Sequence, residues 1–185
     1  MSKKFLLLIL VLVGMLCPAW AEEKVAVPNM DMSMVLPNDW FVVPKEQAIQ
    51  IIPDGSAIIA TDGTDDQCLL VVSREPTSAR SMEYAILSTV HYVYNKMRGF
   101  VDEEEDMELG GEKAFRIRYE GNFSQNGDLP KRYLRVLAIR NGFLYTIQGS
   151  ARRDFFGKHE GTLREILKTV SWTKKDPEGI KEERL

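Results

Sequence analysis

Hydrophobic and polar residues alternate in four consecutive runs between Asp102 and Ser150, with the period of two that is typical of half-buried β-strands. Gly110-Gly111 separates the first two runs, and Asn141-Gly142 separates the last two. Both dipeptides tolerate the positive φ angles of the tightest hairpin turns. The pattern therefore predicts an antiparallel meander of four strands around which the rest of the chain is organised.

The first predicted hairpin contains an acidic run, Asp102 to Asp106, with two interpretations. It could bind a cation or a basic partner, although its spacing is not that of a calcium-binding loop. It could instead be an edge strand whose charges discourage association with another sheet. A turn at Gly110-Gly111 favours the edge strand, because it places acidic residues opposite basic ones, which stabilises a strand pair. The expected pairs are Glu103 with Arg118, Glu105 with Arg116 and Glu108 with Lys113.

The second predicted hairpin is apolar on one face and partly apolar on the other. Leu137, Ile139 and Leu144 lie on the second face, close to the turn. Apolar residues on both faces imply that the sheet is covered on both sides. On the first face, a turn at Asn141-Gly142 pairs Val136 with Ile147 and Ala138 with Tyr145.

Further from that turn, the second face carries three polar residues, Arg135, Thr146 and Gln148, with Arg135 directly opposite Gln148. They suit a small-ligand site at the polar end of the sheet. The alternative is a solvent-exposed strand end without a ligand. A concave pocket lined by the three residues would distinguish the first interpretation from the second.

Apolar residues recur at helical spacing in Ser81–Arg98, which predicts the first long helix. Gly99 is expected to end it in a left-handed conformation, with Phe100 closing the end. A second stripe of this helix could line a pocket or a partner surface, or simply pack at a rim; it consists of Tyr84, Leu87, His91 and Tyr94. The expected buried stripe is Met82, Ala85, Ile86, Val90, Val93 and Met97.

A second helix is predicted over Phe155–Val170, with Asp154 as its N-cap. Gly157 and Gly161 lie four residues apart and could allow another backbone to approach closely. A short closing strand follows the helix at residues 169–172. The expected buried face is Phe155, His159, Leu163, Ile166 and Val170.

The segment before the first helix predicts further strands, at residues 30–36, 57–60 and 68–73. The first of them alternates Met30, Met32 and Met34 with polar or smaller residues. Thioethers suit Cu(I), but no histidine or cysteine is near in sequence, so these methionines are interpreted as adaptable packing. The chain as a whole is thus expected to be an α+β protein.

Residues 1–21 have the properties of a signal peptide: two lysines, an apolar core at Phe5–Leu16, and the small-residue motif Ala19-Trp20-Ala21. Cys17 does not fit a lipoprotein motif, because Leu16 precedes it. Cleavage before Glu22 would export the protein, to the periplasm of a Gram-negative cell or otherwise outside the cell. One domain is expected over residues 22–172, followed by a charged, flexible tail over 173–185.

The mature chain has 22 basic and 27 acidic residues, a net charge of −5. This argues against general binding to nucleic acid or to anionic membranes. No transmembrane segment is expected in the mature chain, because its apolar runs are too short to span a bilayer.

Residues that could carry catalysis or hold a metal are few. Cys68 is the only cysteine of the mature chain and lies in an apolar strand, where a buried, inert thiol is expected. His91 and His159 lie on different predicted helices and make a poor zinc site. No phosphate-binding glycine loop or nucleophile elbow is present, so neither a cofactor nor a metal is expected.

Four features together resemble the PsbP-like and DcrB-like families: the strand leading into Leu36-Pro37-Asn38-Asp39-Trp40, the long helix, the meander, and the last helix running into Val170-Ser171-Trp172. These families begin with a strand followed by Pro-x-x-Trp and end with a helix before a Ser-aromatic strand. The resemblance covers Met30–Trp172 and implies an α/β/α sandwich in which two helices cover an antiparallel sheet. The relatives include a photosystem II subunit, a nuclear-import factor that binds a small GTPase, and envelope lipoproteins.

The resemblance therefore implies an accessory or binding role in place of catalysis. One hypothesis is a non-catalytic protein that docks on another component of the cell envelope or on a secreted component. It predicts an exposed apolar or aromatic patch without a deep cavity. The alternative is a small-ligand binder that uses Arg135, Thr146 and Gln148. An enzyme would require Cys68 to be accessible and close to a histidine.

Overall fold

The computed structural model describes residues 23–27, 30–43, 56–61, 68–77, 81–122 and 129–173. The predicted signal peptide and nearly all of the charged tail lie outside these ranges, so both stay predictions. No helix in the described part of the chain combines the length and the apolar character needed to cross a membrane.

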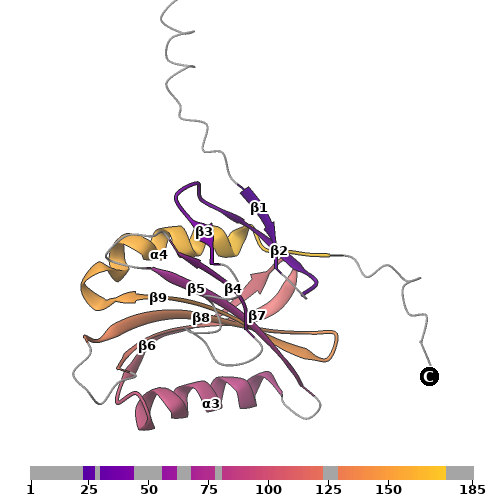
Figure 1. The fold of residues 1–185 in the computed structure, drawn as a ribbon. Helices are drawn as coiled ribbons and strands as arrows, with labels where there is room; N and C mark the ends of the chain where they lie inside the picture. The colour runs from indigo at the N-terminus through magenta and orange to yellow at the C-terminus, as the bar shows by residue number, and fades with distance from the viewer. Residues whose placement is uncertain are drawn as a thin grey trace, which may run out of the picture.

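The predicted meander is present as strands β6 (Phe100–Leu109), β7 (Glu112–Gly121), β8 (Lys131–Arg140) and β9 (Phe143–Arg152). Three earlier strands extend it beyond β9, namely β5 (Leu69–Pro76), β4 (Ser56–Thr61) and β3 (Phe41–Val42). Together they form one antiparallel sheet in the order β3–β4–β5–β9–β8–β7–β6 (Figure 1).

Both tight turns of the meander have the predicted backbone conformation. The φ angles are +58° at Gly110 and +87° at Gly111, and +50° at Asn141 and +76° at Gly142. Positive values at both central residues match the right-handed twist of the strands that they join. The strand registers that follow confirm every predicted pair across the two hairpins.

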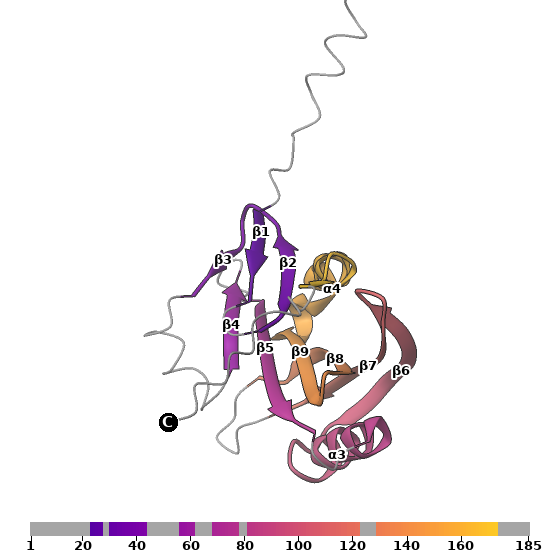
Figure 2. The same ribbon diagram turned by 90° about the vertical axis from the view of Figure 1, so that its right-hand side faces the viewer.

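Two helices, α3 (Met82–Asn95) and α4 (Arg153–Lys168), cover opposite faces of the main sheet (Figures 1 and 2). Helix α3 packs on β6, β7 and β8, and α4 packs on β8 and β9. A second sheet lies on the α4 side and contains β1 (Glu23–Ala26), β2 (Met32–Leu36) and β10 (Ser171–Trp172) in the order β1–β2–β10. The arrangement is the predicted α+β sandwich, with the opening strand placed in a sheet of its own.

Each face of the main sheet has its own hydrophobic core. The larger core lies under α4 and includes Met32, Met34 and Cys68, all fully buried, which confirms the packing role predicted for these residues. Trp172 closes this core and donates its Nε1–H to the carbonyl oxygen of Leu109 at 2.8 Å. The core under α3 consists of Ala85, Val93, Met97, Ile117, Tyr119, Tyr133, Leu137 and Leu144.

The end of α3 differs from the prediction. The left-handed residue is Arg98, with a φ of +50°, and Phe100 is 46% exposed at the start of β6. Gly99 is needed for another reason: a Cβ atom there would lie 1.9 Å from the carbonyl oxygen of Glu120. The glycine therefore lets the segment after α3 cross close to the backbone of β7.

Helix α4 begins two residues earlier than predicted and is rotated from the predicted face. Its N-cap position is Arg152, which makes no side-chain cap hydrogen bond, while Asp154 lies in the first turn. Phe156 is buried and Phe155 is only partly buried. No described backbone approaches Gly157 or Gly161, because a Cβ on either would meet no described atom within 4 Å. The buried residues of α4 are Phe156, Leu163, Ile166 and Leu167.

Candidate functional site

The solvent side of α3 is aromatic and almost uncharged. Tyr84 is 54% exposed, Leu87 67%, Tyr92 39% and Tyr94 52%, and His91 is also exposed. Three residues of the predicted stripe, Tyr84, Leu87 and Tyr94, are thus more than half accessible to solvent. We call these five exposed residues the α3 face.

The α3 face is unusual in its lack of charge for a helix that borders solvent. Glu83 is the only charged residue among the 14 residues of α3, whereas α4 carries seven in 16. Helices that stay in water normally have a charged outer face, as α4 does. The composition of α3 instead matches the interior of protein interfaces, where tyrosine is enriched and lysine and glutamate are depleted.

A small cavity of about 100 Å³ lies between the N-terminal half of α3 and the main sheet. Two of the three predicted polar residues of the sheet line it, Arg135 from β8 and Thr146 from β9, together with Tyr84 of α3. The structure thus brings together half of the predicted site residues, whereas His91 and Tyr94 do not line the cavity. The other lining residues are Glu75, Ala85, Ser88, Thr89, Leu137 and Leu144. We call this space the Arg135 cavity.

Arg135 is held in place by neutral groups. Its Nε–H and Nη2–H donate to Oε1 of Gln148 at 2.9 and 2.6 Å, and its Nη1–H donates to the Thr89 hydroxyl at 3.3 Å. The hydroxyl of Tyr119 also donates to Oε1 of Gln148, at 2.9 Å. Gln148 therefore positions the guanidinium from behind and does not itself line the cavity.

The surroundings of Arg135 are apolar on the side away from the cavity. Tyr119 and Tyr133 stack with ring centroids 4.8 Å apart, and the Arg135 guanidinium lies 5.7 Å from the Tyr119 centroid. Burial raises the pKa of Tyr119 to about 12, although Arg135 acts to lower it. Tyr119 is therefore a neutral hydrogen-bond donor at any physiological pH.

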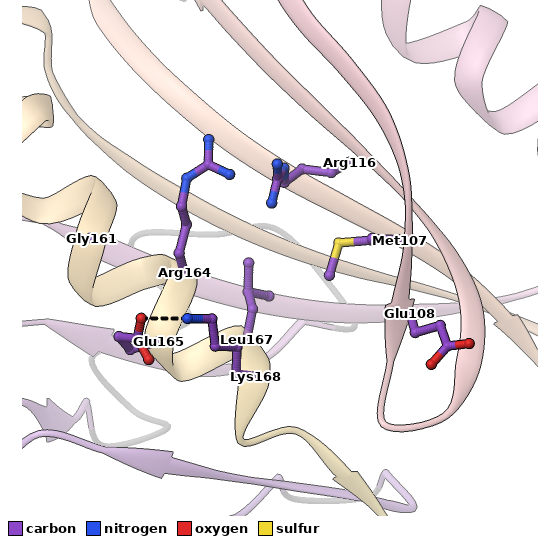
Figure 3. Close-up of a pocket in the computed structure, with 8 residues that line it drawn as sticks. All are labelled: Met107, Glu108, Arg116, Gly161, Arg164, Glu165, Leu167 and Lys168. Atoms are coloured by element: carbon purple, nitrogen blue, oxygen red, sulfur yellow. Dashed lines mark hydrogen bonds and ion pairs between the residues drawn. The ribbon is translucent and has the colours of Figure 1, made fainter.

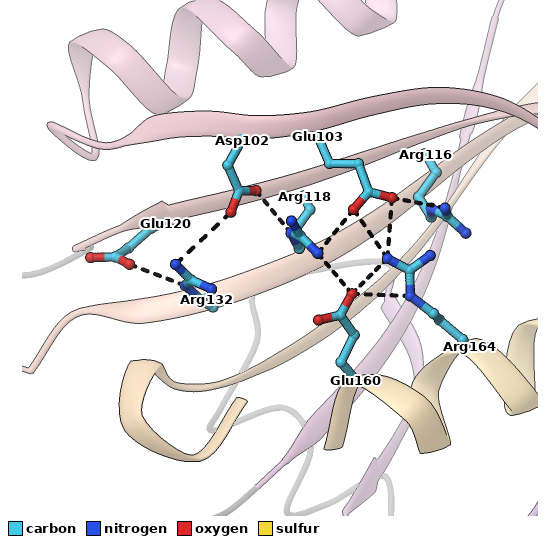
Figure 4. Close-up of polar contacts among 8 residues, drawn as sticks. All are labelled: Asp102, Glu103, Arg116, Arg118, Glu120, Arg132, Glu160 and Arg164. Carbon is cyan, nitrogen blue, oxygen red and sulfur yellow. Dashed lines mark hydrogen bonds and ion pairs between the residues drawn. The ribbon is translucent and has the colours of Figure 1, made fainter. Parts of the chain in front are cut away.

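The acidic run of β6 is tied into a charge network that reaches α4 (Figure 4). Glu103 lies 2.8 Å from Nη2 of Arg116, 2.9 Å from Nη1 of Arg118 and 3.1 Å from Nη2 of Arg164. Glu160 of α4 contacts Arg118 at 3.0 Å and Arg164 at 2.6 Å. Three residues of the run, Asp102, Glu103 and Glu105, thus have basic partners. Strand β6 is the last strand of the main sheet, which confirms the interpretation of the run as a charged edge strand.

The network predicts that the protein loses stability in acid. Burial acts to raise the pKa of Glu103, but hydrogen bonds from Arg164 and Arg116 outweigh it and hold that pKa below the ordinary value of 4.5. A carboxyl group with a lowered pKa contributes its full stability above pH 4.5 and loses it as the pH falls through the folded-state pKa. We expect Glu103→Gln to lower the free energy of unfolding at pH 7 by about 1–3 kcal/mol and to weaken its decline between pH 5 and pH 3.

Urea unfolding at several pH values measures this difference. Glu104→Gln is the matched control, because Glu104 neighbours Glu103 on β6 but is exposed. The free energy of unfolding of Glu104→Gln should equal that of the unsubstituted protein at each pH. An acid dependence of Glu103→Gln identical to that of the unsubstituted protein would contradict the prediction.

A larger pocket, of about 310 Å³, lies between the β6–β7 hairpin and the C-terminal half of α4 (Figure 3). Met107 and Leu167 supply apolar surface, and Arg116 and Arg164 lie at one end. Both arginines donate to carboxylates of the charge network. Because Lys168 is likewise paired with Glu165 at 2.6 Å, the basic side chains around this pocket are neutralised within the protein.

A third hollow, of about 200 Å³, surrounds Asp31 at the end of the main sheet. The Asp31 carboxylate accepts hydrogen bonds from Tyr145 and Asn141 and lies 3.8–3.9 Å from Arg140 and Arg74. Its charge is thus balanced by the surrounding residues. The contacts connect the segment before β2 to the β8–β9 hairpin, which is a structural role.

The described residues contain no group of three or more histidine, cysteine or acidic side chains able to hold a metal ion. Cys68 is fully buried, so the accessible thiol that catalysis by Cys68 would need is not available. His91 is exposed on α3, and His159 is partly buried on α4.

Two functional groups were missed from the sequence alone. Thr89 lies at the same helical spacing as Ala85 and Val93, and this spacing could have indicated that its hydroxyl faces the sheet. The spacing of four residues between Glu160 and Arg164 could have indicated their ion pair. No sequence signal joins that pair to Glu103 on β6.

No protein-family model and no curated protein sequence matches the chain. Several solved structures are similar to it at low sequence identity, among them those of three characterised proteins. LpqN of Mycobacterium tuberculosis, described as involved in cell envelope biogenesis, has a TM-score of 0.61 at 12% identity over 83% of this chain and 91% of LpqN. Cyanobacterial PsbP of Synechocystis has a TM-score of 0.59 at 15% identity, over 84% of this chain and 95% of PsbP.

The third structure is the Ran-binding protein Mog1p of Saccharomyces cerevisiae. It has a TM-score of 0.58 at 9% identity, over 84% of this chain and 97% of Mog1p. Coverage above four-fifths in each case shows that the similarity extends over the whole sandwich and not over one motif. The chain has the PsbP-like fold that these three proteins share.

Proposed function

We propose that this is an exported, non-catalytic accessory protein that docks through the α3 face on another protein of the cell envelope or on a secreted protein. The observation that carries the proposal is the exposure of Tyr84, Leu87 and Tyr94 on a helix with a single charged residue. Exposed apolar side chains that gather on one face mark interaction sites more often than scattered ones do.

The chemistry of the α3 face indicates the kind of partner. The exposed residues within α3 include no lysine or arginine, which nucleic acids and anionic membranes would require. Tyrosine combines a large apolar ring with a polar hydroxyl and loses little conformational entropy on binding. The expected partner is therefore a protein whose surface opposite these aromatic side chains is mainly apolar.

The alternative of a protein that encloses a whole small molecule has less support. Sites of that kind usually have volumes of about 300–1,000 Å³, whereas the Arg135 cavity has about 100 Å³. The pocket beside α4 is larger, but each of its basic side chains is already paired with a carboxylate.

Two further observations support the proposed role. The predicted signal peptide at residues 1–21 indicates export. The fold is that of LpqN, described as involved in cell envelope biogenesis, and of the Ran-binding protein Mog1p. A fold does not determine a function, so the assignment depends on the α3 face.

Site-specific photo-crosslinking tests the proposal in the native host, with the full chain and its own signal peptide. A photoreactive phenylalanine analogue at Leu87 or Tyr94 should give one discrete adduct with a partner protein, which mass spectrometry identifies. Tyr94→Ala should then lower the affinity for that partner at least tenfold, because truncating a central interface tyrosine costs about 2 kcal/mol or more.

The matched control carries the same photoreactive residue at Glu165, which is 71% exposed on α4. It should give no adduct. Adducts from position 165 alone, or none from positions 87 and 94, would overturn the proposal. An adduct of twice the mass of the protein would show association with a second copy and would overturn the assignment of a different partner.

A further inference from the structure

The Arg135 cavity contains a positive charge that the described part of the chain does not neutralise. The contacts of the Arg135 guanidinium are with the Gln148 amide oxygen, the Thr89 hydroxyl and the Tyr119 ring. None of the described carboxylates lies within ion-pairing distance of it. The other arginines of β7 and β8 differ, since Arg116, Arg118, Arg132 and Arg140 each contact at least one carboxylate.

Arg135 also retains hydrogen-bonding capacity. A guanidinium has five N–H donors, and three of those of Arg135 are used in the contacts to Gln148 and Thr89. One N–H on Nη1 and one on Nη2 remain. These two atoms are the ones that bind both oxygens of a carboxylate in an end-on arginine pair.

The neighbouring groups are suited to the same ligand. Thr146 lines the cavity, and its hydroxyl has no hydrogen-bond partner among the described residues. Ser88 adds a second hydroxyl at the edge of the cavity. Both can donate to a carboxylate oxygen, and charge-assisted hydrogen bonds of this kind are stronger than neutral ones.

The size and the location of the cavity identify the source of the carboxylate. A volume of about 100 Å³ accepts a side-chain carboxylate but not a whole metabolite. Tyr84 belongs both to the cavity lining and to the α3 face, so a protein bound on that face lies next to the opening. We propose that an aspartate or glutamate side chain of the docking partner enters the cavity and pairs with Arg135.

This inference rests on the proposed docking function, but the carboxylate site can be tested without the partner. Sodium acetate is the probe, because it is the smallest analogue of an acidic side chain. In NMR titrations of the ¹⁵N-labelled mature protein, acetate should shift the Arg135 Nε–Hε resonance and the Thr89 and Thr146 amides in a saturable way. A dissociation constant on the order of 10 mM is expected for so small a ligand. Acetamide and sodium chloride should give no saturable shift.

Three variants make the titration specific. Arg135→Gln should abolish the saturable shift, and Thr146→Val, which leaves the guanidinium in place, should weaken binding severalfold. Glu75→Gln should strengthen it, because Glu75 also lines the cavity and repels an incoming anion. If Arg135→Gln does not fold, the other two variants still test the carboxylate site, because they are expected to change the acetate affinity in opposite directions.

The outcomes separate the two proposals. The carboxylate site would be overturned if acetate gave the same chemical-shift changes as sodium chloride, or if Thr146→Val and Glu75→Gln left the acetate affinity unchanged. Neither result would affect the proposed docking through the α3 face. Saturable acetate binding without photo-crosslinked adducts from positions 87 and 94 would instead establish the anion site. It would overturn the docking function, and with it the proposal that the bound carboxylate is a side chain of the partner.

Discussion

Phe156→Ala is expected to lower the free energy of unfolding by about 3–5 kcal/mol, one of the two largest effects of a single substitution that we predict. Phe156 is 1% exposed and belongs to the core between α4 and the sheet. Removing its ring loses the transfer free energy of a large apolar side chain and leaves a cavity that a rigid sheet cannot fill. Urea unfolding monitored by the circular dichroism of the sheet measures the loss.

Phe155→Ala is the matched control, since it removes the same ring from the preceding position of the same helix. Phe155 is only partly buried, and Arg152 and Lys158 lie 4.9 Å from its ring centroid. Its replacement should cost about 1 kcal/mol or less, in line with weak cation–π contacts near the surface. A larger loss for Phe155→Ala than for Phe156→Ala would show that α4 packs on the face predicted from the sequence.

The reason why the sequence could not select between these two phenylalanines is geometric. Each continues a helical stripe, Phe155 with His159 and Ile166, and Phe156 with Leu163 and Leu167. Strand β9 ends at Arg152 and α4 begins at Arg153, so no loop separates the strand from the helix. The direct connection therefore determines which face of the helix is turned toward the sheet. That rotation depends on the sheet beneath, which periodicity does not describe.

The meander was predictable because its information is local. Two dipeptides with positive φ determine the turns, and each turn determines a strand register. The register in turn places Arg135 beside Gln148, as predicted. Short-range turn chemistry therefore accounts for the pairing and for the position of the polar residues on the sheet.

The Arg135 cavity and the charge network were not predictable to the same extent, because each needs a helix docked on the sheet. Thr89 reaches Arg135 across 46 residues of sequence, and Arg164 reaches Glu103 across 61. Charge pairing within β6 and β7 followed from the turn, but its extension to α4 depends on tertiary packing. The sequence predicted the components of the site and the structure shows how they meet.

Gly99→Ala is expected to lower the free energy of unfolding by about 3 kcal/mol or more, because overpacking against a backbone cannot be relieved by a side-chain rotation. The new Cβ would lie 1.9 Å from the carbonyl oxygen of Glu120. The same crossing contains the hydrogen bond from Asn122 N–H to the carbonyl oxygen of Met97, at 3.0 Å. Thermal and urea unfolding measure the loss.

Gly157→Ala tests whether this loss comes from the crossing or from the change of residue type. Gly157 lies on the exposed side of α4, where a Cβ meets nothing within 4 Å, so alanine should raise the stability by about 0.5–1 kcal/mol. Opposite signs for the two variants would show that Gly99 is required for close approach. Because the crossing anchors the C-terminal end of α3 to β7, Gly99→Ala should also weaken photo-crosslinking from Tyr94, whereas Gly157→Ala should leave it unchanged.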